Sequence, residues 1–381
     1  MEKPFNGFEY LEKVRQQKGG NQASGSDLAE YLNYKAREKG VPLIGKFELT
    51  PLCNFDCKMC YVHLMKDQLG TAEIMTVEQW KDLMYQAWQA GMIYCSLTGG
   101  ECLAYPGFEE IYLYLQDLGC EVNVLTNGYL LDERWIEFFR KHRPLTVQIT
   151  LYGSNDDVYE RVTGKRAFST VMNNIRRLVE TGIQVIVSLT PNSYLGEDVL
   201  ETLRVAYDIT NEVVINPMLS PPRKETGRTG IGDEADIDVY VRLYRLKAEL
   251  DGQQTGEPYE GILPEVGGSC HECMDHGIRC GAGRSSFSID WKGIMTLCGS
   301  LDYVQCHPME EGFASAWKKL NQAARNWPRV PECEGCAYQS VCITCAAYET
   351  QFAEPGKQPK ALCERAKYFV RHGIGSIPVC E

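Results

Sequence analysis

Cys53, Cys57 and Cys60 lie within one short segment of the sequence, CNFDCKMC. Three thiolates at this spacing can bind an iron–sulfur cube, in which each of the four irons needs a ligand. One iron is then left open, and a cofactor or substrate can coordinate it. A zinc knuckle or a disulfide loop would use the same residues, because short cysteine clusters bind several metals.

A second group of cysteines occupies the C-terminal part of the chain. Its members are Cys270, Cys273, Cys280, Cys298, Cys306, Cys333, Cys336, Cys342, Cys345, Cys363 and Cys380.

The first residues have no apolar signal-peptide core, and no segment approaches the roughly 20 apolar residues of a membrane span. We therefore expect a cytoplasmic protein without a membrane partner. Thiols stay reduced in a cytosol, so the 17 cysteines indicate metal ligands rather than disulfides.

The charge of the chain argues against nucleic acid as a partner. The 39 basic and 51 acidic residues give a net charge of −12. The sequence has no dense stripe of lysine and arginine that would follow a phosphate backbone.

Short apolar runs alternate with helical patterns from residue 44 to residue 218. The predicted strands are 44–50, 93–98, 121–126, 146–151, 183–189 and 213–217. The predicted helices are 76–90, 107–118, 132–142, 168–181 and 197–210. This alternation predicts an α/β fold of parallel strands with crossover helices, whose active loops share one edge. The cysteine segment follows the first strand, which ends at Pro51.

The same patterns suggest four parts of the chain. Residues 1–43 are expected to be an N-terminal arm and a leading helix capped by Asp27. Residues 44–232 carry the predicted strands and end in a long loop that could close over a substrate. Residues 233–268 are expected to be a bridging helix and a linker. Residues 269–381 hold the cysteine-rich module, with a hairpin at 287–297 that turns at 290–293.

The cysteine segment, followed directly by Tyr61, resembles the CxxxCxxC-aromatic loop of radical S-adenosylmethionine enzymes. The resemblance implies a partial (β/α)6 TIM-like barrel, a [4Fe-4S] cluster and S-adenosyl-L-methionine bound to its open iron. Reductive cleavage of that molecule would release a 5′-deoxyadenosyl radical. Gly99, Gly100 and Glu101 are similar to the GGE motif of this family, which holds the amino group of S-adenosylmethionine. Cys102 replaces the usual proline and is either a small packing residue or a thiol within reach of the reaction.

Polar residues at the other strand ends are further candidates by the same resemblance. Those for contacts to the cofactor or substrate are Tyr61, Asn127, Gln148, Thr150, Arg161 and Ser188. Arg161 could pair with the methionine carboxylate as a planar fork. Tyr152, like Cys102, is a candidate catalytic residue. Each of these residues could equally be a turn or cap residue.

The C-terminal cysteines resemble those of the SPASM domain, which adds two auxiliary four-iron clusters. By position, one cluster would use Cys280, Cys298, Cys345 and either Cys273 or, less favoured, Cys270. The other would use Cys333, Cys336, Cys342 and Cys363. The spacer between Cys342 and Cys345 has two residues where the usual pattern has three. A zinc ribbon formed by Cys333, Cys336, Cys342 and Cys345 is the alternative.

Enzymes with this module act mainly on peptides, so the expected substrate is a ribosomally made precursor peptide or a protein. The expected product is an oxidative crosslink, either a thioether or a carbon–carbon bond. The expected partner is an external electron donor, flavodoxin or ferredoxin, and a separate peptide-recognition protein could also take part. Alternatives are peptide epimerisation, dehydrogenation of a small molecule, a non-enzymatic metal scaffold, and sulfatase maturation to formylglycine. In the sulfatase-maturing enzymes an aspartate occupies the position of Gly299.

Overall fold

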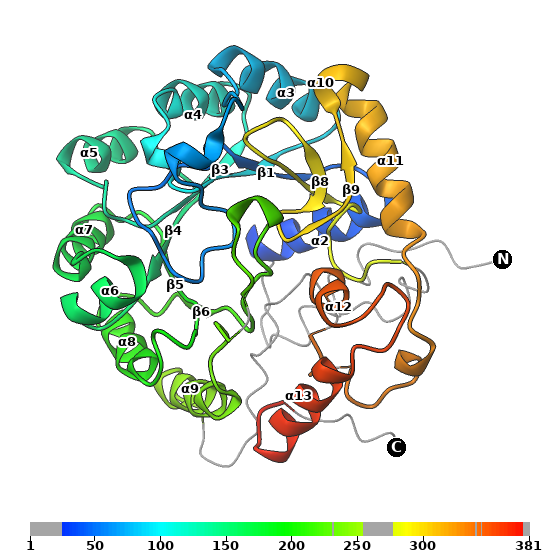
Figure 1. Ribbon diagram of the computed structural model, residues 1–381. Coiled ribbons are helices and arrows are strands. Elements are labelled where there is room, and N and C mark those ends of the chain that lie inside the picture. Colours follow the sequence, from blue (N-terminus) through cyan, green and yellow to red (C-terminus); the bar gives the residue numbers. More distant parts are fainter. Residues whose placement is uncertain (1–24, 231, 254–276, 340, 344, 376–381) are drawn as a thin grey trace.

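The computed structural model describes residues 25–375 except 231, 254–276, 340 and 344 (Figure 1). Most of the expected N-terminal arm, residues 1–24, lies outside the described residues. So do Cys270, Cys273, Cys380 and most of the linker expected before residue 268.

One sheet of nine strands organises the fold, in the order β6-β5-β4-β3-β2-β1-β7-β8-β9. Its parallel part consists of β1 (Ile44–Glu48), β2 (Tyr94–Thr98), β3 (Glu121–Thr126), β4 (Thr146–Leu151), β5 (Val185–Leu189) and β6 (Val213–Ile215). All six predicted strands are confirmed, and parallel pairing brings their carboxyl ends to one edge. The C-terminal hairpin extends this sheet, because β7 (Ser286–Ile289) pairs in parallel with β1. The strands β8 (Met295–Cys298) and β9 (Leu301–Cys306) follow in antiparallel order.

Helices surround the curved sheet on its outer face (Figure 1). They are α3 (Val77–Gln89), α4 (Phe108–Asp117), α5 (Glu133–Lys141), α6 (Asp156–Thr163), α7 (Phe168–Glu180), α8 (Asp198–Tyr207), α9 (Ile237–Leu250), α10 (Pro308–Glu311) and α11 (Phe313–Arg325). Their apolar residues pack on the outward side chains of the strands. Phe47 of β1, for example, contacts Trp80 of α3 with ring centroids 6.0 Å apart. Alternate residues of β1 to β4 are buried and half-buried, so the half-buried ones, such as Lys46, Ser96 and Gln148, face the concave side.

Two features of the helices differ from the sequence prediction. The helix α2 spans Gly25–Lys39, so Asp27 lies in its first turn and the prediction that Asp27 is its N-cap is wrong. The short helix α6 was not predicted. Its N-cap Asn155 accepts hydrogen bonds from the backbone of Asp157 and Val158, both at 3.1 Å.

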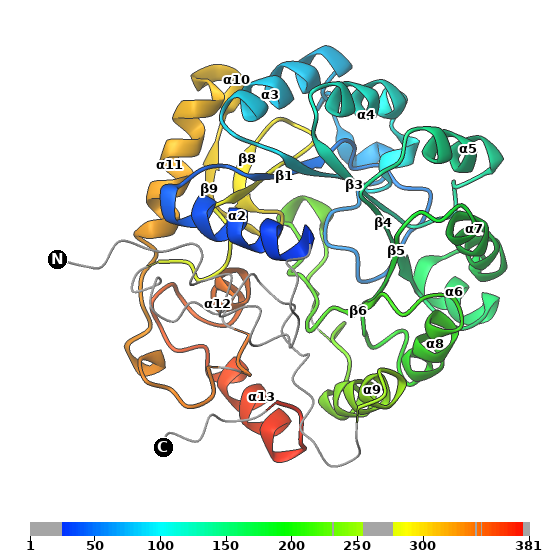
Figure 2. The same cartoon turned by 180° about the vertical axis from the view of Figure 1, so that it is seen from behind.

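The last two helices close the gap between the two edges of the sheet. The helices α12 (Ala346–Phe352) and α13 (Lys360–Arg371) lie beside α9 and below α11 in both views, while α2 lies behind the sheet in Figure 1 and in front of it in Figure 2. Arg365 of α13 donates to the carbonyl of Pro217 at 2.6 Å, just past β6. Among the described helices, none combines the length and the apolar composition that crossing a bilayer requires.

Phe287 ties the C-terminal hairpin to the barrel. Its ring is 5.8 Å from Phe47, 5.0 Å from Phe313 and 6.2 Å from Trp317, and its side chain is buried. The C-terminal module that was expected to begin at residue 269 therefore shares the sheet and the apolar core of the barrel.

We expect Phe287→Ala to lower the free energy of unfolding by about 3–5 kcal/mol, because it leaves a cavity between β1 and α11. Tyr303→Ala removes an aromatic ring that is 62% exposed on the nearby strand β9, and its cost should be about 1 kcal/mol. Anaerobic denaturant titration measures both values. Equal effects of the two substitutions would show that the hairpin is not part of the barrel core.

Candidate functional site

The cysteine loop begins after β1 and holds its three thiols close together. The backbone N–H of Phe55 donates to Cys53 Sγ at 3.4 Å, and that of His63 donates to Cys60 Sγ at 3.3 Å. Burial raises the pKa of Cys53 to about 12, and Glu101 and Cys60 add to the rise. Burial also raises the pKa of Cys57 well above its usual range, and the other two thiolates contribute. The raised pKa values show that thiolates are unfavourable here unless a cationic centre stabilises them, so the residues fit an iron–sulfur cluster.

Two segments that are distant in sequence hold the tip of this loop. The N–H groups of Asp56 and Lys58 donate to the carbonyls of Thr163 and Val162 at the end of α6, each at 3.0 Å. The guanidinium of Arg228 donates to Asp56 Oδ1 at 2.7 Å, to the carbonyl of Lys58 at 2.6 Å and to the carbonyl of Cys57. The position of Cys57 therefore depends on a side chain 171 residues away.

Gly99 and Gly100 follow β2 and lie against the chain that enters the cysteine loop. The Gly100 N–H donates to the Thr50 carbonyl at 2.7 Å. A Cβ on Gly99, whose φ is +148°, would lie 2.4 Å from the Thr50 oxygen, and one on Gly100 would lie 2.4 Å from the Leu52 oxygen. The glycines therefore permit a close backbone contact with the entry to the loop. The predicted approach to a ligand at this turn remains a prediction.

Glu101 lies beneath this turn with its carboxylate buried. Its Oε1 accepts from Thr126 Oγ1 at 2.7 Å and from the Leu103 N–H at 3.1 Å, and its Oε2 accepts from the Asn127 N–H at 2.8 Å. Burial raises the pKa of Glu101, and these donors act in the opposite sense. The carboxylate thus joins the ends of β2 and β3, and its contact to an amino group of the cofactor remains a prediction.

Asn127 connects the end of β3 to the cysteine loop. Its Nδ2 donates to Asn54 Oδ1 at 2.7 Å and lies 3.6 Å from Cys53 Sγ. Tyr152, past β4, packs edge-on against Phe55 at 6.5 Å. Burial and the nearby thiolates, Cys57 first, raise the pKa of Tyr152 well above its usual range, so that its hydroxyl stays protonated. The structure therefore brings Asn127 and Tyr152 to the cysteine loop.

Cys102 is fully buried below the Gly99–Glu101 turn. Its thiol donates to the carbonyl of Leu125 at 3.2 Å, and burial, followed by Glu101, raises its pKa well above the usual range. A protonated thiol that is directed at a sheet carbonyl supports the packing interpretation of this residue.

The other predicted residues are more dispersed. Gln148 and Thr150 are half-buried on β4, whereas Ser188 is buried and accepts from Asn216 Nδ2 at 3.2 Å. Arg161 is exposed on α6, and its Nε donates to the carbonyl of Tyr194 at 2.8 Å. The described contacts of Ser188 and Arg161 are thus with other protein groups and not with the three cysteines.

Sequence reasoning missed an ion pair between Glu48 and Arg223. Both guanidinium Nη atoms of Arg223 lie 2.7 Å from the Glu48 carboxylate, and Nη2 also donates to the Gly299 carbonyl at 2.9 Å. Burial alone would lower the pKa of Arg223, but Glu48 outweighs it and the pKa rises. The Arg223 N–H donates to the carbonyl of Tyr61 at 3.0 Å. The pair therefore joins β1, the residue after the cysteine loop and the turn after Cys298. In the sequence, the only sign of this ion pair was an acidic residue in a predicted buried strand.

The C-terminal cysteines form two groups in space. Cys333, Cys336, Cys342 and Cys363 line one cavity of about 80 Å³. Burial raises the pKa of Cys342 to about 12, and the other three thiolates add to the rise. The four residues that the resemblance assigned to one cluster therefore lie around a common space.

Cys280, Cys298 and Cys345 make up the other group. Burial raises the pKa of Cys298 to about 12, with contributions from the Cys280 and Cys345 thiolates. Cys345 thus lies with this group. The zinc-ribbon alternative would instead require Cys345 to lie with Cys342. Within the described part of the chain, no three cysteine, histidine or acidic side chains are arranged to hold a single metal ion. A four-iron cluster accepts more widely spaced thiolates, and Cys273, the expected fourth ligand, lies outside the described residues.

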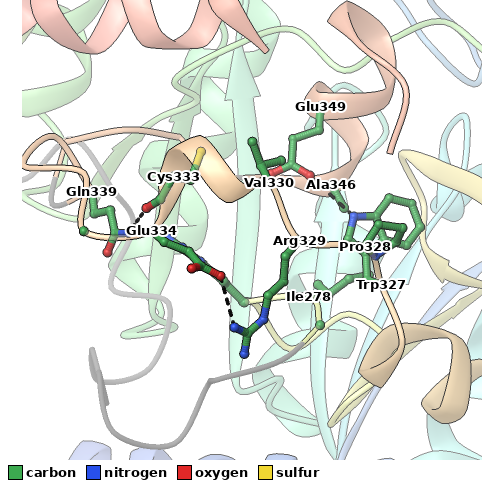
Figure 3. A pocket seen from close by; sticks show the side chains of 13 residues that line it. Ile278, Trp327, Pro328, Arg329, Val330, Cys333, Glu334, Gln339, Ala346 and Glu349 are labelled. Atoms are coloured by element: carbon green, nitrogen blue, oxygen red, sulfur yellow. Dashed lines mark hydrogen bonds and ion pairs between the residues drawn. The ribbon is translucent and has the colours of Figure 1, made fainter. Parts of the chain in front are cut away.

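A cavity of about 340 Å³ lies beside the Cys333 group (Figure 3). Cys333 is on one wall, and Glu349, in the helix that follows Cys345, is on another. Glu349 Oε2 accepts from Trp327 Nε1 at 3.4 Å, and burial raises the pKa of Glu349. A pair of Arg329 and Glu334, 3.2 Å apart, crosses the mouth of the cavity. The cavity therefore extends from Cys333 to the helix that follows Cys345.

We predict that Arg228→Ala weakens iron binding by the cysteine loop about tenfold or more, because the loop loses the side chain that fixes its tip. The cluster of the cysteine loop is identified by the electron paramagnetic resonance signal that a Cys57→Ala variant lacks. The loss of this signal is measured while a chelator competes for the iron. Arg166→Ala, which removes an exposed ion pair with Asp157, is the control. Equal retention of iron in both variants would contradict the prediction.

Residues 47–221 match the family model described as the radical SAM superfamily. The subtilosin biosynthesis protein AlbA of Bacillus subtilis is 31% identical over 157 residues, which are 41% of this chain and 34% of AlbA. The chain thus aligns with about a third of that relative. The mycofactocin maturase MftC of Mycobacterium tuberculosis is 24% identical and matches over 87% of this chain and 81% of MftC.

Solved structures of SuiB from Streptococcus suis share the fold. The structure bound to S-adenosylmethionine has a TM-score of 0.66 at 17% identity and covers 94% of this chain and 87% of SuiB. The structure bound to the precursor peptide SuiA has a TM-score of 0.66 at 15% identity, with 93% and 87% coverage. The family match and the shared parallel sheet identify residues 47–221 of this chain as a radical SAM domain.

Proposed function

We propose that the chain is an enzyme that reductively cleaves S-adenosylmethionine and abstracts a hydrogen atom from a peptide, to install an oxidative crosslink. One observation carries this proposal: the structure gathers three separate groups of thiols. The first is the loop after β1 in the radical SAM domain, and the other two lie beside the open part of the barrel. A radical reaction that ends in oxidation needs a route for an electron to leave, and the two additional groups provide one.

The residues of the chain have distinct roles in this proposal. Cys53, Cys57 and Cys60 would hold a [4Fe-4S] cluster, which supplies the electron that breaks the carbon–sulfur bond of S-adenosylmethionine. The Gly99–Glu101 turn and Asn127 fix the loop beside the strand ends. The half-buried polar residues on the concave face, Gln148 and Thr150 among them, would bind and orient the cofactor and the substrate. The buried walls of the barrel would exclude water from the reacting carbon.

A ribosomally made peptide is the proposed substrate, since SuiB has been solved with a precursor peptide and AlbA serves the biosynthesis of subtilosin. An external carrier such as flavodoxin or ferredoxin would supply electrons, and a separate recognition protein could deliver the peptide. A cytoplasmic location agrees with the free thiols of the described cysteines.

Two alternatives receive less support from the site. Formylglycine formation would use an acid after Cys298, where the chain has Gly299; a Cβ there would lie 3.1 Å from Glu48 Oε1. That oxygen already accepts a hydrogen bond from Arg223 Nη2 at 2.7 Å, so it is held in an ion pair and not directed at a substrate. Epimerisation would need a thiol to return a hydrogen atom, and the candidate Cys102 is directed at the Leu125 carbonyl.

We expect Cys57→Ala to abolish deoxyadenosine formation and to leave the iron of the C-terminal groups bound. Cys102→Ala is the matched control and should keep turnover within about threefold of the parent, because it removes only a packing contact and a hydrogen bond to the Leu125 carbonyl. Anaerobic assays with S-adenosylmethionine and a reductant, with iron analysis of each variant, test both expectations. Unchanged turnover in Cys57→Ala would overturn the proposed function, and complete loss in Cys102→Ala would overturn the packing interpretation.

A further inference from the structure

Lys46 places a charged side chain on the concave face of the sheet. It is half-buried in the middle of β1, between Ser96 of β2 and Ser288 of β7 in the strand register. The next strand places Asn123 beside Ser96. Side chains in register on parallel strands project to the same face. Barrel interiors are usually filled by bulky branched side chains, so these small polar neighbours leave room around the lysine.

Gly299 approaches Lys46 from the C-terminal hairpin. A Cβ on Gly299 would lie 3.6 Å from Lys46 Nζ and 3.1 Å from Glu48 Oε1. An acidic side chain at this position could therefore bring its carboxylate to the ammonium of Lys46. Because the residue is glycine, that place is left to another molecule.

The protein's own acids near this point are already engaged. Glu48 accepts from both Nη atoms of Arg223, each at 2.7 Å. Asp290, whose charge also acts on Arg223, accepts from two backbone N–H groups of its own turn at 3.0 and 2.9 Å. Among the described residues, Lys46 forms no ion pair of contact length. An ammonium has three donor hydrogens, and those that Tyr61 does not accept are available to a ligand.

The position of Lys46 relates it to two of the thiol groups. Tyr61, the residue after the cysteine loop, raises the pKa of Lys46. Glu48 and Cys298 add to the rise, which outweighs the effect of burial, so the ammonium stays charged. Cys298 directly precedes Gly299. A group bound to Lys46 would therefore lie between the radical SAM loop and the turn that carries Cys298.

We propose that Lys46 binds a carboxylate of the peptide substrate and thereby determines which part of the peptide is modified. The carboxylate belongs to an aspartate or glutamate side chain or to the C-terminus of the peptide. A contact between an ammonium and a carboxylate is stronger in a partly buried site than on the surface, because water screens it less. This inference rests on the proposed function and names its substrate class, a peptide with a carboxylate close to the reacting carbon.

The test is the steady-state kinetics of the reconstituted full chain with the short peptide encoded beside its gene. Peptide variants change each aspartate or glutamate to its amide in turn, and one further variant carries a C-terminal amide. One of these changes should raise the KM of the parent enzyme for the peptide about tenfold, because it removes a charged hydrogen bond. Lys46→Met should raise this KM by the same factor, and combining the two changes should cause no further rise. The peptide variant that shows this coupling identifies the source of the carboxylate.

Lys319→Met is the matched control, because Lys319 is 61% exposed on α11 and pairs with Glu311. It should leave KM for the peptide unchanged. Lys46→Arg, which keeps the charge, should raise this KM less than Lys46→Met does. If Lys46→Met fails to retain its iron, Lys46→Gln is measured in its place with the same expectation.

An unchanged KM for the peptide in a Lys46 variant that retains its iron would overturn the inference and leave the proposed function standing. So would full additivity between the Lys46 variant and every peptide variant. S-adenosylmethionine also has a carboxylate, and a rise in its KM alone would assign Lys46 to the cofactor and overturn the inference. A parent enzyme that leaves the peptide unmodified would overturn the proposed function and the inference together.

Discussion

The close backbone contact between Gly99–Gly100 and the chain at Thr50–Leu52 is the constraint on which the rest of the site depends. It allows the end of β2 to lie directly against the entry to the cysteine loop, where any side chain would collide with a carbonyl oxygen. Glu101 follows and places a buried carboxylate under the ends of β2 and β3. The loop is then held from the other side by α6 and Arg228. The three thiols are therefore fixed by the barrel, and a bound cluster would have a defined place over its strand ends.

The local elements of the barrel were predictable because their signals are local. Each of the six strands is a short apolar run, and each of the five predicted helices has an apolar stripe of ordinary length. The helix α6 spans only eight residues, too few for such a stripe. The pairing of β7 with β1 joins residues more than 200 positions apart. Pairing over that distance leaves no trace in a local pattern.

The site shows the same difference between features with a local signal and contacts between distant residues. Its cysteines were found from spacing and resemblance, and the structure places Cys345 with Cys280 and Cys298 and keeps Cys363 with Cys333. The contacts that position them were not found, because Glu48 and Arg223, or Cys57 and Arg228, are joined only by the fold. Cys102 was open to two interpretations in the sequence, and its direction toward the Leu125 carbonyl favours packing.

The measurement that tests the central claim most directly is the mass of a candidate peptide after anaerobic incubation with the reconstituted enzyme. The reaction contains S-adenosylmethionine and a reductant in ordinary and in heavy water, with a short peptide encoded beside the gene of this protein. The account predicts that the peptide stimulates deoxyadenosine formation and loses two hydrogens. A peptide that gains one solvent deuterium at otherwise unchanged mass would identify an epimerase and contradict the account. Deoxyadenosine formed equally with and without the peptide, whose mass stays unchanged, would contradict it in favour of a small-molecule substrate.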